Sequence, residues 1–189
     1  SVPAAAAPPP KRFGRTAVQV VGVNLLVWTY DRFIREGGEN PVFRVGFRSW
    51  EENLRAGWEW DDNNFNTNQF LHPYHGNLSF NAARSNGYPF WEAAGFTFAG
   101  SWLWEYLFET HHPSLNDWVA TSVSGAALGE IFHRLGGMVR DQTATGAERT
   151  WRELGGFVID PIGGLNRLLD GSWSRQGANP PGRFPASVA

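Results

Sequence analysis

Three uncharged and largely apolar stretches constrain the fold of this chain more than any other feature of its sequence. They span residues 16–30, 93–104 and 118–129, and the longest contains fifteen residues. A helix that crosses a membrane needs about twenty consecutive apolar residues, so each stretch falls short of that length. We expect all three to form helices buried inside a protein, with a half-inserted or membrane-surface location as the alternative.

Capping patterns indicate where the helices begin. Ser49, Ser114 and Thr150 each precede a carboxylate by three residues, which is the spacing of a reciprocal N-terminal cap. Strand signals are sparse, because only residues 42–47 alternate over more than a few positions. The sequence therefore predicts a mostly α fold, a single compact domain of about five or six helices. Their expected ranges are 16–36, 49–57, 66–86 (either continuous or broken at Pro73), 89–110, 114–136 and 150–170, the last with a break at Pro161.

The two ends of the chain differ in composition from its middle. Residues 1–14 form an Ala/Pro-rich segment, and residues 172–189 are rich in Pro and Gly, so we expect two extended linkers. The helical domain should then occupy residues 15–171. A start without Met fits the mature end left by a signal peptide, and a trimmed chain would look the same.

Charge and composition exclude several classes of function. The net charge is -2 and the sequence contains no run of Lys or Arg that could follow a nucleic-acid backbone, so we do not expect nucleic-acid binding. Cysteine is absent, which rules out disulfides, thiol nucleophiles and thiolate metal sites. Aromatic residues make up 15% of the chain, and this content fits a core, an interface or a membrane boundary.

Three glutamates are candidates for chemistry. Glu105 and Glu109 lie one helical turn apart among aromatic residues, where two carboxylates repel each other unless a cation or a proton lies between them. Glu130 on the next predicted helix has no capping role, and we predict a buried, paired acid there. The structural alternative is that arginines such as Arg84 neutralise these acids.

Two histidines lie three residues apart around a proline. Pro73 disfavours helical geometry in the residues before it, so we expect His72 to be extended and a helix to begin at or after the proline. His72 should then point into the core towards the glutamates, and His75 should lie near the surface. His72 is therefore the fourth candidate catalytic residue.

A metal site would have to use the same few side chains. Its candidate ligands are His72, His75, Glu105 and Glu109. Glu109 with His112, and Glu130 with His133, also have the Glu-x-x-His spacing of di-iron helical bundles. The first of these pairs lies at a predicted helix end, just before a proline, which disfavours that site. We expect no cofactor.

Other polar residues share the faces of these helices. Ser101 lies one turn before Glu105, and Asp117 serves as the capping carboxylate of the helix that follows. Thr121, Gly125 and Gly129 form a narrow face that allows another helix to approach closely. The predicted binding residues are Arg84, Ser101, Asn116 and Asp117.

Four short motifs occur in a fixed order along the chain. They are HPxxG at residues 72–76, WEYxxE at 104–109, PSxND at 113–117 and GxxxGE at 125–130. As a set, within a core of about residues 60–135, they resemble a domain-of-unknown-function family of bacterial envelope proteins. The resemblance implies an exported protein of a Gram-negative bacterium, located in the periplasm or at the outer membrane, and it carries over no activity.

Two functions of different class fit these observations. In the first, the chain is a structural or interaction module of the envelope, in which the four candidate residues form one buried network with Arg84. Its aromatic surface would meet an envelope protein partner or a membrane surface. In the second, the chain is a metal-dependent or His/Glu-based hydrolase acting on a lipid or cell-wall substrate, with an open cleft where the candidates converge. The sequence does not determine the oligomeric state.

Overall fold

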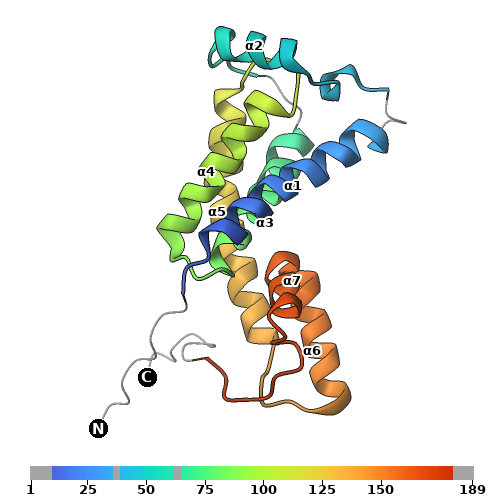
Figure 1. Ribbon diagram of the computed structural model, residues 1–189, viewed down its shortest axis with the longest axis vertical. Coiled ribbons are helices and arrows are strands. Elements are labelled where there is room, and N and C mark those ends of the chain that lie inside the picture. Colours follow the sequence, from blue (N-terminus) through green and yellow to red (C-terminus); the bar gives the residue numbers. More distant parts are fainter. Residues whose placement is uncertain (1–9, 36–38, 62–64, 181–189) are drawn as a thin grey trace.

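Seven α-helices make up most of the part of the chain described by the computed structural model, which is residues 10–35, 39–61 and 65–180 (Figure 1). Most of the two predicted linkers lies outside these residues. The mostly α prediction is confirmed, with one or two more helices than expected. The helices are α1 (Phe13–Phe33), α2 (Phe47–Ala56), α3 (His72–Arg84), α4 (Phe90–Leu107), α5 (Leu115–Val139), α6 (Gly146–Ile159) and α7 (Pro161–Leu169).

The extra helix results from the predicted break near Pro161. The side chain of Asp160 accepts a hydrogen bond from the backbone N–H of Gly163 at 2.8 Å and caps α7, while α6 ends one residue earlier. Proline is well tolerated in the first turn of a helix because its missing N–H is not needed there. Residues 42–47, which alternate like a strand, instead form the short 3₁₀ turn η2 (Pro41–Phe43) and the start of α2.

Two of the three predicted N-terminal caps are wrong. Ser114 caps α5 as expected, because its Oγ accepts a hydrogen bond from the N–H of Asp117 at 3.2 Å. Ser49 instead lies in the first turn of α2, where its Oγ accepts from the N–H of Gly46 at 3.0 Å. Thr150 lies within α6, which begins at Gly146. Both helices therefore begin a few residues before the predicted caps.

The segment before α3 also differs from the prediction. Residues 67–71 form a π-helical turn, η3 (Thr67–Leu71), that continues directly into α3. His72 has φ -60° and ψ -49°, which is helical rather than extended geometry. Pro73 occupies the first turn of α3, where the helix can pass through it. His72 and His75 therefore lie three residues apart on one continuous helix.

The α3–α5 crossing organises the centre of the molecule. A Cβ atom built on Gly76 would lie 2.0 Å from the carbonyl oxygen of Thr121, and one built on Gly125 would lie 2.5 Å from the Cα of Gly76. Only hydrogen fits between the two backbones at this point. The predicted small-residue face of α5 is thus confirmed, and Phe80 of α3 lies against Gly129 further along it.

The other helices are arranged around this pair. α1 and α4 lie alongside α3, with α2 across one end of α4 and with α6 and α7 beside the far half of α5 (Figure 1). The indole N–H of Trp28 on α1 donates to the carbonyl of Phe43, and that of Trp50 on α2 donates to the carbonyl of Leu107. No helix within the described ranges is both long enough and apolar enough to cross a membrane.

The interior of this fold is polar and much of its surface is apolar. Among the described residues, the twelve largest fully buried side chains include only one apolar side chain, that of Phe80. Buried asparagines hold the helices together, for example Asn24, whose Nδ2 donates to the carbonyl of Gly100 at 2.9 Å. By contrast, Val18 on α1 is 73% exposed and Trp91 on α4 is 82% exposed. This arrangement reverses the usual distribution of a domain in water.

Candidate functional site

Acidic side chains and one imidazole meet where α4 leads into α5. Glu105 lies near the end of α4, and its Oε2 accepts a hydrogen bond from the N–H of Ser114 at 2.9 Å. Asp117 lies in the first turn of α5, and its Oδ1 is 3.7 Å from Nε2 of His72 on α3. Three helices therefore contribute to one polar cluster, which we call the acid–His cluster and define as His72, Glu105, Glu109 and Asp117.

Glu105 and Asp117 of the acid–His cluster are buried, His72 and Glu109 are partly buried, and the cluster is incompletely hydrogen-bonded. Glu105 is 0% exposed, and its Oε1 has no hydrogen-bond partner among the described residues. The same is true of Nε2 of His72, Oγ of Ser101 and Oγ1 of Thr121. Within the described ranges, Glu105 and Glu109 form no ion pair with Lys or Arg. Cation pairing, the structural alternative for these two acids, is therefore not what stabilises them.

Burial keeps protons on the two glutamates. It raises the pKa of Glu105 to about 8 and raises the pKa of Glu109 well above the usual value of a glutamate. The negative charge of an ionised Glu105 raises the pKa of Glu109 further, because two nearby carboxylates repel each other. Burial lowers the pKa of His72, and Asp117 partly offsets this effect. At neutral pH the pair of glutamates thus carries at least one proton.

The free energy of unfolding should fall as the pH rises from 4.5 to about 8. Because the folded pKa of Glu105, about 8, exceeds its ordinary value of 4.5, the folded state binds more protons than the unfolded state between these pH values. The glutamate therefore destabilises the fold increasingly up to pH 8, by at most about 1.4 kcal/mol per pH unit. Glu105→Gln should reduce this slope between pH 6.5 and 8 in urea unfolding followed by tryptophan fluorescence.

The control for this substitution is Glu51→Gln on the exposed face of α2, where Glu51 pairs with Arg55. For Glu51→Gln, the slope of the unfolding free energy against pH should match that of the unmodified chain. An unchanged slope in Glu105→Gln would show that the buried carboxyl does not bind the extra proton.

His75 is buried, contrary to the prediction that it lies near the surface. Its Nε2 hydrogen-bonds Oδ1 of Asn24 at 2.7 Å, and its ring meets that of Trp104 edge-on with centroids 4.8 Å apart. Burial lowers the pKa of His75 to about 3, so the ring is neutral. Because the helix continues through Pro73, both histidines face inward, but His75 joins α3 to α1 and α4.

Glu130 does not join the acid–His cluster. It accepts hydrogen bonds from Nε of Arg84 and from Nε of Arg134, both at 2.8 Å. Of the predicted buried, paired acid, the pairing is confirmed, but Glu130 is only partly buried, and the predicted single network with Arg84 is wrong. Thirteen residues of helix separate Glu130 from Asp117, which corresponds to roughly 20 Å along α5.

A cleft opens next to the acid–His cluster, on the other side of Ser114. Backbone hydrogen bonds from Glu59 to Pro113 and from Leu115 back to Glu59 attach residues 59–61 to the start of α5. Asn116 completes this attachment, because its amide group hydrogen-bonds both the N–H and the carbonyl of Asp61. The cleft is lined by Glu59, Trp60, Asp61, Thr110, His111, His112 and Ser114.

Sequence reasoning named only His112 and Ser114 among the residues of this cleft, and neither of them for a role in it. Nδ1 of His112 lies 2.8 Å from Oε1 of Glu59, and both side chains are about half exposed. These residues belong to loops, and helical periodicity gives no signal for such positions. In the described part of the chain, no group of three or more His, Asp or Glu side chains is arranged to hold a metal ion.

A comparison with known protein families shows one family whose model matches this sequence. The model of a family described as a domain of unknown function, DUF3943, matches residues 57–162, more than half of the chain. The chain belongs to this family. The DUF3943 match includes α3 to α6 and every member of the acid–His cluster, and α1 and α2 precede it. The expected resemblance to a domain of unknown function is thus confirmed, over a longer range than residues 60–135.

Further comparisons add no relative of known activity. No curated protein and no solved structure matches the chain.

Proposed function

We propose that this DUF3943 protein is a structural or interaction module of the bacterial envelope, in the periplasm or at the outer membrane, and that its apolar surface rests in a lipid bilayer. The observation that carries the proposal is the reversed distribution of polar and apolar side chains. Exposing many large apolar side chains to water is unfavourable, and contiguous apolar surface marks a site of contact with a partner or a membrane.

Three helical segments that expose apolar side chains are free of charge, and together we call them the apolar band. Residues 16–30 of α1, 93–104 of α4 and 118–129 of α5 contain no Asp, Glu, Lys or Arg. Leu26 in the first of these segments is 69% exposed, and Val123 in the last is 57% exposed. At 1.5 Å per residue the segments extend about 18 to 22 Å, which is less than the roughly 30 Å hydrocarbon core and fits partial insertion.

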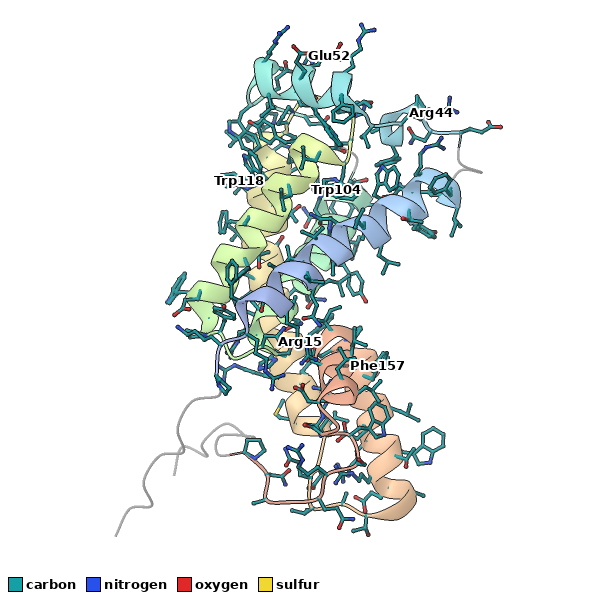
Figure 2. All side chains as sticks on the ribbon, in the orientation of Figure 1. Arg15, Arg44, Glu52, Trp104, Trp118 and Phe157 are labelled. Carbon is teal, nitrogen blue, oxygen red and sulfur yellow. The ribbon has the colours of Figure 1, made fainter. Side chains whose placement is uncertain are left out.

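Charged and aromatic side chains border this band. Figure 2 shows Arg44 and Glu52 near the α2 end of the molecule and Arg15 near the start of α1. Trp118 lies towards the α2 end, where its ring contacts that of Trp58 with centroids 5.2 Å apart. Trp and Tyr concentrate at the boundary between lipid and water in membrane-associated proteins. This pattern favours a lipid surface over a protein partner, which would not require charges at both borders.

Flotation with vesicles tests the proposal. The purified chain should float with phosphatidylcholine vesicles in a density gradient, and salt at about 1 M should not release it, because apolar contacts are not screened. A chain that stays at the bottom of the gradient, or that leaves the vesicles at high salt, would count against insertion. Equal flotation with and without an added envelope extract would argue against a protein partner as the main occupant.

The second candidate function is a His/Glu-based hydrolase acting on a lipid or cell-wall substrate. The observation that favours it is the set of unpartnered buried atoms on Glu105 and His72 beside the cleft at Ser114. A protonated Glu105 could act as a general acid, and the neutral His72 beside Asp117 could act as a general base. Release of fatty acid from phospholipid vesicles by the purified chain, lost in His72→Ala, would support it. Absence of release would leave the acid–His cluster with a structural role.

A further inference from the structure

A second cavity lies at the other end of the molecule, between the far half of α5, α7 and the end of α3. Its volume is about 550 Å³, within the usual range of ligand sites. Its charged lining differs from that of the acid–His cluster, because it contains four arginines and one histidine but only two acids. These residues are Arg84, His133, Arg134, Arg140, Asp160, Arg167 and Asp170.

The acids that line this cavity are fewer than the arginines that line it. Each of the four carboxylates at or near the cavity lies close to two basic side chains. Glu130 is shared by Arg84 and Arg134, Glu153 by Arg149 and Arg167, Asp170 by Arg12 and Arg15, and Asp160 by Arg140 and His133. The lining itself carries four arginines and two aspartates, a surplus of two positive charges, because Glu130 and Glu153 pair with its arginines without lining the cavity.

Arg140 is a buried side chain that forms part of the wall of this cavity. Its side chain is 9% exposed, and its Nη2 donates to the carbonyls of Gly156 and Asp160 at 2.6 and 3.1 Å. A Cβ atom at Gly156 would lie 2.6 Å from Nε of Arg140, so the glycine makes room for the guanidinium. A buried arginine fixed by backbone carbonyls keeps its charge close to the cavity.

Two buried nitrogen atoms at this cavity have no partner. Within the described residues, neither Nε of Arg140 nor Nδ1 of His133 makes a hydrogen bond. Asp160 satisfies neither atom, because its Oδ2 accepts a hydrogen bond from Nη1 of Arg140, and not from Nε, at 3.4 Å and lies 3.8 Å from Nδ1 of His133. Its Oδ1 already accepts from the N–H of Gly163. Buried donors without acceptors are costly, and an anionic ligand in the cavity would relieve this cost.

We propose that this cavity binds a phosphate group, either free or as the headgroup of a phospholipid. The surplus of two positive charges in the lining matches the charge of a phosphate monoester, about -1.5 to -2 at neutral pH. Arginine is the side chain best suited to bind phosphate oxygens through paired N–H groups. Arg134, whose side chain is 70% exposed, lies at the mouth of the cavity and can reach the ligand without disturbing the interior.

The test uses Arg134→Gln, His133→Gln and a control variant with the same change of charge. Arg48→Gln on α2 is the control, because Arg48 is exposed, pairs only with Glu52 among the described residues and lies far from the cavity. Inorganic phosphate should bind the unmodified chain saturably in isothermal titration calorimetry at constant ionic strength. Arg134→Gln should weaken this binding about tenfold, as expected when one charge-assisted contact is lost, and Arg48→Gln should not change it.

A vesicle arm distinguishes the source of the phosphate group. If a lipid headgroup is the ligand, phosphatidic acid vesicles should bind more tightly than phosphatidylcholine vesicles, with the difference reduced in Arg134→Gln but not in Arg48→Gln. If free phosphate is the ligand, titration should succeed without this lipid preference. Failure of both arms, or equal weakening by Arg134→Gln and Arg48→Gln, would overturn the proposal. The outcome is independent of the membrane proposal, which concerns binding to phosphatidylcholine alone.

Discussion

Replacement of Gly76 by alanine is expected to lower the free energy of unfolding by about 3 kcal/mol, the upper end of the usual cost of overpacking a core. The added Cβ would lie 2.0 Å from the carbonyl oxygen of Thr121 and 2.8 Å from the Cα of Gly125. Both neighbours are backbone atoms, so no side chain can rotate away. α3 and α5 must separate, and His72 would move away from Asp117 at the same time.

Gly95→Ala on α4 is the matched control for this substitution. Gly95 lies in the interior of a helix, and a Cβ added there meets nothing within 4 Å. Alanine is favoured over glycine inside helices by about 1 kcal/mol, so Gly95→Ala should stabilise the chain. Urea unfolding curves of both variants measure the difference. Equal stability of the two variants would contradict the close crossing of α3 and α5.

Introduction of a charge into the apolar band should strongly weaken vesicle binding. Val18 on α1 and Val123 on α5 are both more than half exposed, so aspartate at either position should leave the fold intact in water. In lipid, one buried charge costs about 2.5 to 3.5 kcal/mol on insertion scales, which corresponds to roughly a hundredfold loss of partitioning. Vesicle titrations followed by tryptophan fluorescence can measure this loss.

The control for the band substitutions is Val158→Asp on α6. Val158 is also exposed, but α6 lies beside the far half of α5 and contains charged residues in its first half. We expect vesicle binding by Val158→Asp to match that of the unmodified chain. If all three variants bind equally well, the uncharged band does not contact lipid.

The helices of this fold could be predicted from the sequence because the patterns that mark them lie within each helix or at its ends. The uncharged stretch before Asp31 and the Ser114 cap both lie within the elements that they define. The starts of α2 and α6 could not be predicted from the capping pattern, because a hydroxyl three residues before an acid fits more than one position in a first turn. Ser49 occupies the third helical position and bonds back to Gly46, which the spacing alone does not reveal.

The candidate site could be predicted only as far as single helices determine it. The prediction that Glu105 and Glu109 share one helix is wrong, because α4 ends at Leu107 and Glu109 lies two residues beyond it. That burial raises the pKa of both acids could be inferred from their aromatic surroundings. The approach of His72 to Asp117 and the burial of His75 against Asn24 depend on how α3 lies across α1 and α5. No local sequence pattern predicts the rotation of α5 about its axis that brings Glu130 within hydrogen-bond distance of Arg84.

Site-directed spin labelling measures most directly whether the apolar band contacts lipid. The chain has no cysteine, so a single cysteine at Val18 or Val123 gives one label, and a cysteine at Glu51 on α2 gives a reference in water. On vesicles, labels at both band positions should collide more with oxygen and less with a water-soluble nickel complex than the label at Glu51. Band labels that remain as accessible to nickel as the Glu51 label would contradict the account.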